Sequence, residues 1–310
     1  MANFVFQFST MGCPCALHLE AADPAAARRA YRYVVAECRR LDHKYSHYRQ
    51  NSYLSHINQH AGEWLRMDRE TADLLDLAAT VYRLSDGAFD ITSGALSRIW
   101  DMTRKHLPDQ DEIAAALRQC GWHRVEWQRP WLRINTPGVK LSLGGLAKEY
   151  AADRCARLCR MAGVASGVVD LGGDLAIVGP HANGKPWLLG IKSPAATSRA
   201  RASIELAAGG LATSGDYERA LEIEGRRYSH IIDARTGLPV TGYASVSVVA
   251  DSCLVAGAAS TLAMLLGRGE GARFLNDLGL AFLCIDALGC IEQAGDACVG
   301  ADQRVPERFG

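Results

Sequence analysis

The chain has 310 residues, of which 48% are hydrophobic, so it has enough apolar side chains for a large continuous core. Its 34 basic and 34 acidic residues balance, and no lysine- or arginine-rich run occurs, so the charge gives no reason to expect a nucleic acid partner. No apolar run reaches the roughly 18–20 residues of a membrane helix. The first residues lack a basic region, a long apolar region and a lipobox, so we expect a cytoplasmic protein with no membrane span.

Hydrophobic periodicity predicts the first half of the chain in order. Strands over 4–8 and 15–19 precede helices over 24–42 and 68–85, with a short helical turn that ends near 58. Residues 98–122 are predicted to be helical with a break at Pro108. Strands at 125–127, 131–134 and 139–143 follow, and Gly144-Gly145 opens a helix that runs to about 161.

The second half is richer in strands, which are predicted at 167–171, 175–178, 187–191, 203–206, 245–249, 281–285 and 289–293, with helices at 254–266 and 269–278. Because the strands come in runs and outnumber the helices, we expect an α+β fold with mixed or antiparallel sheets. No linker separates independent parts, so residues 1–302 are predicted to form a single domain, with a loose tail at 303–310.

Two polar, glycine-punctuated clusters at 211–217 and 228–237 flank a short segment with apolar alternation around Leu221 and Ile223. This pattern predicts a hairpin whose ends carry hydroxyls, carboxylates and His230. Functional groups on loops of a rigid frame usually bind or react. His230 is the best candidate for proton transfer near neutral pH.

The double glycine at Gly144-Gly145 connects a predicted strand to a predicted helix. Without side chains there, backbone amides can approach a ligand, and a helix start favours an anion such as a phosphate. Lys148 adds a positive charge at the same place. The alternative is an ordinary tight turn between a strand and a helix, and the residues alone leave both open.

The chain resembles the ApbE family of FAD:protein FMN transferases, through motifs that occur in the family's order. They are Met11-Gly12, Tyr48, the Ser52–Asn58 segment, Gly87-Ala88-Phe89-Asp90-Ile91-Thr92, Gly144-Gly145, Asp170-Leu171-Gly172-Gly173-Asp174, Thr213-Ser214-Gly215-Asp216-Tyr217 and Ser229-His230-Ile231-Ile232-Asp233. The resemblance implies a single α+β body with a flavin cleft. It implies an enzyme that cleaves FAD, attaches FMN to a Thr or Ser hydroxyl of an acceptor flavoprotein and releases AMP, with Mg²⁺ at the diphosphate.

The resemblance also assigns roles to residues. The residues expected to bind FAD are Met11, Tyr48, Ala88, Phe89, Asp90, Ser142, Lys148, Thr213 and His230. Those expected to act in catalysis are His230, Asp233 and Lys148, with Asp233 either acting directly or orienting His230. The metal ligands are expected among the backbone at Gly145 and the hydroxyls of Ser260 and Thr261.

The chain departs from the family at the metal site. The family carries Ala-Asp-x-x-x-Thr where this chain has glycine at Gly257 in place of the aspartate, and Ser142 stands where the family has a second aspartate. Glu149 replaces a common glycine. Asp251 and Glu149 are the acidic residues that could supply the missing carboxylate. An active transferase with an altered metal site therefore competes with a catalytically impaired FAD-binding accessory paralogue and with an FAD pyrophosphatase.

Overall fold

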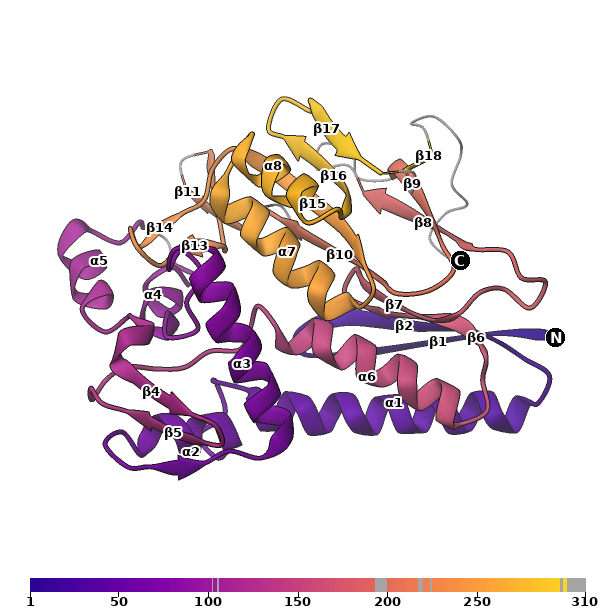
Figure 1. The fold of residues 1–310 in the computed structure, drawn as a ribbon, viewed down its shortest axis with the longest axis horizontal. Helices are drawn as coiled ribbons and strands as arrows, with labels where there is room; N and C mark the ends of the chain where they lie inside the picture. Colours follow the sequence, from indigo (N-terminus) through magenta and orange to yellow (C-terminus); the bar gives the residue numbers. More distant parts are fainter. Residues whose placement is uncertain are drawn as a thin grey trace.

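The computed structural model describes residues 1–101, 103–104, 106–192, 200–216, 220–223, 225–295 and 298–299. Within them, a central sheet has eight strands in the order β1-β2-β6-β7-β10-β15-β16-β17, and every neighbouring pair is antiparallel (Figure 1). The strands are β1 (Ala2–Thr10), β2 (Cys13–Ala21), β6 (Ser166–Leu171), β7 (Asp174–Gly179), β10 (Gly210–Gly215), β15 (Tyr243–Ala250), β16 (Ala281–Asp286) and β17 (Ile291–Ala294).

The two faces of this sheet are covered by different layers. Helices cover one face, namely α1 (Pro24–Tyr45), α6 (Ala147–Met161) and α7 (Cys253–Leu266), with α8 (Glu270–Asp277) beside α7 (Figure 1). A small sheet of β8 (Trp187–Lys192), β9 (Ala200–Leu206) and β18 (Cys298–Val299) packs on the other. Strand alternation divides the core accordingly, since Val169 joins the helical side and Val168 joins the β8–β9 side.

A second group of elements lies at one end of this body (Figure 1). It contains α2 (Tyr53–Gln59), α3 (Arg69–Leu84), α4 (Gly94–Ile99), α5 (Gln110–Leu117), a 3-10 turn (Trp122–Arg124) and a sheet of β3 (Leu65–Arg66), β5 (Trp131–Ile134) and β4 (Val125–Gln128). Two hairpins are nearby, β11 (Ala220–Ile223) with β12 (Arg226–Ser229), and β13 (Ile232–Asp233) with β14 (Leu238–Pro239). Side-chain caps fix the starts of α3, at Asp68, and of α5, in the Asp109–Glu112 capping box, whereas α4 has no side-chain cap.

The predicted α+β class with antiparallel sheets is confirmed, as is the hairpin around Leu221 and Ile223. The predicted strand at 139–143 is wrong. The segment is extended with alternate side chains buried, but its backbone bonds go elsewhere: Asn58 binds both polar groups of Leu141, and the Ser142 N–H donates to Ile91. The alternation along 139–143 reflects which side chains are buried, and it does not show that the segment belongs to a sheet.

The prediction of helix over 98–122 is also wrong in part. Helix α4 begins earlier, at Gly94, and ends at Ile99, while α5 begins only at Gln110. The described residues between the two helices are turns and irregular backbone. The proline break was therefore real, but the helices on its two sides are short.

No helix among the described residues is long and apolar enough to cross a membrane. The single domain over 1–302 stays a prediction, and the expected tail at 303–310 and Tyr217 of the 213–217 cluster lie outside the described residues.

Candidate functional site

The candidate site is built around the start of α6. Gly144 and Gly145 lead into Leu146, which precedes the first helical residue, and no side chain caps this helix end. The N–H groups of Leu146 and Ala147 donate to the Leu143 carbonyl, and the positive end of a helix dipole attracts anions. Phe89 packs against this turn, since a Cβ on Gly145 would lie 3.2 Å from its ring.

Lys148 lies in the first turn of α6 and is fixed by an ion pair. Its Nζ is 2.8 Å from Oδ2 of Asp174, which begins β7 and is only 2% exposed. Burial opposes the charge of the ammonium, but the carboxylates of Asp174 and Glu149 outweigh burial and raise the pKa of Lys148. Lys148 is therefore a permanent positive charge beside the glycine turn.

The β1–β2 hairpin meets the same cluster. Met11 and Gly12 both have positive φ, as a two-residue hairpin turn requires, and Met11 is one of two non-glycine residues with this conformation among those described. A Cβ on Gly172 would lie 2.8 Å from Cys13 and 3.8 Å from Nζ of Lys148. The β1–β2 hairpin and the glycine turn before β7 therefore meet beside Lys148, and the expected contact of Met11 with FAD stays a prediction.

Glu149 points from α6 against α7. It is 8% exposed, and its Oε2 accepts no hydrogen bond from the described residues. A Cβ on Gly257 would lie only 2.4 Å from Cγ of Glu149. The glutamate side chain therefore occupies the space that a side chain at 257 would need. Burial and the neighbouring Asp174 carboxylate raise the pKa of Glu149, and burial also raises the pKa of Asp174.

A cap between the helices sets this arrangement. Both carboxylate oxygens of Asp153 on α6 accept backbone N–H groups at the start of α7, from Cys253 and Leu254, each at 2.9 Å. Glu149 is one turn back along α6 and Gly257 is one turn forward along α7, where Figure 1 shows the two helices side by side. The cap therefore brings Glu149 to Gly257.

Hydroxyl groups line the next turn of α7. Ser214 on β10 bonds to Ser260 at 2.8 Å and to Thr261 at 3.1 Å, and Ser260 also donates to the Gly257 carbonyl. Thr261 follows Gly257 by four residues and so shares its helix face. Thr213 points to the other face of β10, where its hydroxyl meets Ser247 at 2.8 Å.

The described residues include no group of three or more His, Cys, Asp or Glu side chains that could hold a metal by itself. A divalent cation would thus depend on hydroxyls, carbonyls, water or phosphates as further ligands, which suits Mg²⁺. Of the two acidic candidates, Asp251 is exposed before α7, whereas Glu149 is buried against Gly257 with an unpartnered oxygen. The unpartnered oxygen of Glu149 and the nearby hydroxyls of α7 fit a hard cation, and of the two acidic candidates Glu149 is the better placed.

The loop at 85–92 carries three of the predicted flavin residues. Ala88 is fully buried, and its carbonyl accepts the N–H of Ala234 at 3.0 Å, which ties this loop to the segment after His230 and Asp233. The Asp90 carboxylate accepts the N–H groups of Thr92 and Trp122. Burial raises its pKa. In this structure Asp90 therefore stabilises the loop.

Tyr48 and Ser142 are also brought near each other, through His47. The Tyr48 side chain is 84% exposed and its ring lies 3.9 Å from the His47 ring, while His47 Nδ1 is 3.5 Å from the Ser142 hydroxyl. Burial lowers the pKa of His47.

His230 is exposed between β12 and β13. The Asp233 carboxylate binds the Arg235 guanidinium at 2.7 Å and its backbone N–H at 2.9 Å. Burial alone would raise the pKa of Asp233, but Arg235 outweighs it and lowers that pKa. The structure thus shows Asp233 paired with Arg235, and a direct role in catalysis stays a prediction.

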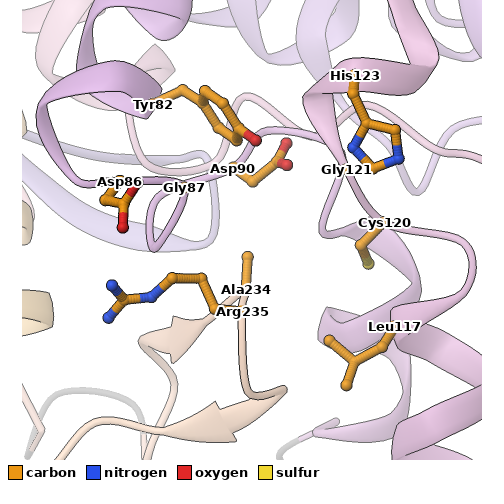
Figure 2. A pocket seen from close by; sticks show the side chains of 10 residues that line it. All are labelled: Tyr82, Asp86, Gly87, Asp90, Leu117, Cys120, Gly121, His123, Ala234 and Arg235. Atoms are coloured by element: carbon orange, nitrogen blue, oxygen red, sulfur yellow. The ribbon is translucent and has the colours of Figure 1, made fainter.

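Two hollows lie away from Lys148 and His230. Figure 2 shows the smaller, of about 280 Å³, with Asp90 and His123 on one side and Arg235 on the other. It is smaller than most sites for drug-sized ligands. A groove of about 1100 Å³ runs along α1, α3 and the far side of α6, past Glu70, Tyr150 and Asp251. Neither hollow is lined by Lys148, Glu149 or His230, so the predicted flavin cleft stays a prediction.

Sequence reasoning did not assign Asp174 or Ser214 to the site, although both lie in quoted motifs. Asp174 directly follows a glycine turn, and Ser214 alternates with Thr213 on a strand. Alternation along β10 already indicated hydroxyls on both faces. The partners of Asp174 and Ser214 come from α6 and α7, which are distant in sequence.

Comparisons with known proteins show which family the chain resembles. A sequence model of the ApbE family matches residues 11–284. The chain is 31% identical over 294 residues to the FAD:protein FMN transferase of Klebsiella pneumoniae (strain 342), covering 91% of this chain and 83% of that protein. It is 30% identical over 260 residues to that of Escherichia coli (strain K12), covering 80% and 74%.

Solved structures show the same fold. The ApbE protein of Thermotoga maritima matches with a TM-score of 0.87 at 30% identity, covering 94% of this chain and 97% of that chain. The flavin transferase ApbE from Vibrio cholerae matches with a TM-score of 0.83 at 25% identity, covering 94% and 97%. The family match spans every residue of the cluster around Lys148, from Met11 to Thr261. The chain therefore belongs to the ApbE family.

Proposed function

We propose that this chain is an FAD:protein FMN transferase, which takes FAD as substrate and a flavoprotein as acceptor. Relatives of that name, 31% and 30% identical over most of the chain, support the proposal. The structural observation that carries it is Lys148, held 2.8 Å from Asp174 at the uncapped start of α6. A fixed positive charge at the start of a helix is an arrangement that favours a diphosphate.

In the proposed reaction, a Thr or Ser hydroxyl of the acceptor attacks the phosphorus of the FMN half of FAD. The bond from this phosphorus to the bridging oxygen breaks, AMP leaves with that oxygen, and FMN stays on the acceptor as a phosphoester. The hydroxyl proton passes to a base, for which His230 is the candidate because histidine titrates near neutral pH. Lys148 stabilises the charge on the phosphates.

The remaining residues of the proposed site bind the flavin and a cation. Met11, Tyr48, Ala88, Phe89, Asp90, Ser142 and Thr213 are proposed to line the flavin half of the site, from the loops described above. A bound Mg²⁺ neutralises diphosphate charge in reactions of this class. The Gly145 backbone, Ser260 and Thr261 are proposed to hold it. A cytoplasmic location is part of the same proposal.

The test mixes the purified protein with FAD, Mg²⁺ and an acceptor flavoprotein. Covalent flavin on the acceptor is read by in-gel fluorescence, and AMP is measured by chromatography. We expect both products in equal amounts, and a loss of both with Lys148→Met. AMP and free FMN without covalent flavin would identify an FAD pyrophosphatase instead. FAD binding without either product would identify an impaired accessory paralogue.

A further inference from the structure

The contact between α6 and α7 holds a buried carboxyl group that the proposed transfer chemistry leaves unexplained. Two carboxylates, Glu149 and Asp174, are 8% and 2% exposed, and Lys148 is the cation paired with Asp174. Oε2 of Glu149 accepts no hydrogen bond from the described residues. Buried carboxyl groups are generally paired or bind metals, so the unpartnered oxygen of Glu149 is a candidate metal ligand.

Beside Glu149 are the carboxylate of Asp174 and the ammonium of Lys148. Further oxygen atoms lie one turn along α7 from Gly257, where Thr261 and Ser260 present hydroxyls and Ser214 joins both from β10. Carboxylate and hydroxyl oxygens suit hard divalent cations such as Mg²⁺ and Mn²⁺, which bind through one or two carboxylates and complete their shell with water or phosphate.

Helix α7 presents no side chain at the centre of this contact, because residue 257 is glycine. The Glu149 side chain fills that notch, with its Cγ 2.4 Å and its carboxyl carbon 3.1 Å from the position of a Cβ on Gly257. The Asp153 cap of α7 fixes the two helices in this register. A carboxylate can thus be delivered to one point from either helix, but not from both at once.

We propose that Glu149 is the carboxylate ligand of a divalent cation held between α6 and α7, with the Thr261 hydroxyl beside it. The inference rests on the proposed function for the use of the ion, because the ion would assist cleavage of the FAD diphosphate. The presence of the ion at Glu149 can be tested without transfer activity.

The test measures Mn²⁺ binding to metal-free protein by isothermal titration calorimetry, with Mn²⁺ alone and again with FAD present. The wild type is expected to bind one Mn²⁺, and Glu149→Gln, which keeps the shape and removes the charge, to bind at least about tenfold more weakly. Glu149→Gly is expected to lose binding likewise. Adding Gly257→Asp to Glu149→Gly moves the carboxylate to α7 and is expected to restore Mn²⁺ affinity to within about threefold of the wild type.

Thermal melting in EDTA shows that each variant is folded before its titration is interpreted. The inference is overturned if the wild type binds no Mn²⁺ under either condition, or if Glu149→Gln and Glu149→Gly bind it as the wild type does. Failure of the proposed function looks different. Mn²⁺ binding that depends on Glu149 without FMN transfer would reject the transferase and keep the metal ligand, whereas transfer with normal Mn²⁺ binding by the variants would reject the ligand alone.

Discussion

Two acidic side chains on opposite sides of α6 have opposite surroundings. Glu70 lies in the groove on the far side and accepts hydrogen bonds from Arg40, Lys44 and the hydroxyl of Tyr150, at 2.6–3.0 Å. Glu149, the neighbour of Tyr150 in the chain, faces α7 and has an unpartnered oxygen. The same turn of α6 thus lies between the Glu70 carboxylate, which accepts several hydrogen bonds, and the Glu149 carboxylate, which has an oxygen that accepts none.

This difference in surroundings distinguishes a carboxylate with a structural role from one with a functional role. Burial alone would raise the pKa of Glu70, but Arg40, Lys44 and Tyr150 outweigh it and lower that pKa to about 2. At Glu149, burial and the Asp174 carboxylate raise the pKa, and the nearby Lys148 does not outweigh them. A satisfied carboxylate joins α1, α3 and α6, whereas an unsatisfied one costs stability and is typical of a binding site. Substitutions of the two residues should therefore have opposite consequences.

The largest expected effect is on catalysis at Glu149. Glu149→Gln should lower the rate of FMN transfer at saturating FAD by about 100-fold or more, because a lost metal ligand removes charge stabilisation from the reaction. The free energy of unfolding in EDTA should stay the same or rise, because a buried unpaired carboxylate is replaced by a neutral amide. The measurements are covalent flavin formed per minute and chemical denaturation.

Asp174→Asn offers a matched control, because it also removes a buried carboxylate but leaves Lys148 without its ion pair. It should lower stability as well as transfer. If Glu149→Gln instead unfolds the protein like a lost ion pair, Glu149 is structural and its contrast with Glu70 disappears.

The next effect concerns Gly257. Alanine favours helices over glycine by about 1 kcal/mol, yet Gly257→Ala should destabilise the protein by about 1–3 kcal/mol, because its Cβ would overlap Cγ of Glu149. Urea denaturation in EDTA measures this. In a Glu149→Gly background the same change should be neutral or stabilising. Equal effects in the two backgrounds would show that the side chains at 149 and 257 do not share one space.

On the satisfied side, Glu70→Gln should lower the free energy of unfolding by about 1–2 kcal/mol at pH 7, since Arg40 and Lys44 lose their carboxylate and solvent screens part of the loss. The pKa of Glu70 is about 2 in the folded state and 4.5 in its ordinary range. Because the folded value is lower, this stabilisation is present above pH 4.5 and is lost as the pH falls towards 2. FMN transfer at pH 7 should change less than about threefold.

The pH series gives this prediction its own control. The difference in stability between wild type and Glu70→Gln should shrink between pH 4.5 and pH 2, and it should be constant from pH 6 to pH 8. A difference that grows on acidification would mean that Glu70 is not the acceptor of these hydrogen bonds.

Much of the fold could be predicted from sequence because its elements carry local signals. The Asp23 and Asp68 caps, the glycine turns and the buried strand around Val246 are all encoded within a few residues. The segment at 139–143 could not be assigned in this way. Its alternation matches a strand, but Asn58, about eighty residues earlier, takes the hydrogen bonds of Leu141 that a neighbouring strand would otherwise make.

The candidate site was predicted unevenly for the same reason. Lys148, Phe89 and the glycine turn follow from local motifs, and the structure brings them together. Glu149 and Gly257 are 108 positions apart in the chain, and the cap of Asp153 on α7 brings them into contact. From sequence, Glu149 and Asp251 were equal candidates for the missing carboxylate. Packing favours Glu149, and packing is not visible in a motif.

The smallest expected effect sharpens that decision. Asp251 is close to Gly257 in sequence, but it is exposed beside the far groove, next to Ser252, the N-cap of α7. Asp251→Asn should therefore change the free energy of unfolding by less than about 0.5 kcal/mol and Mn²⁺ affinity by less than about twofold. Calorimetry on Asp251→Asn and Glu149→Gln under the same conditions measures the change in the free energy of unfolding and the change in Mn²⁺ affinity. A tenfold loss of Mn²⁺ affinity in Asp251→Asn, with none in Glu149→Gln, would make Asp251 the metal ligand in place of Glu149. Nearness to Gly257 in sequence would then identify the ligand better than burial does.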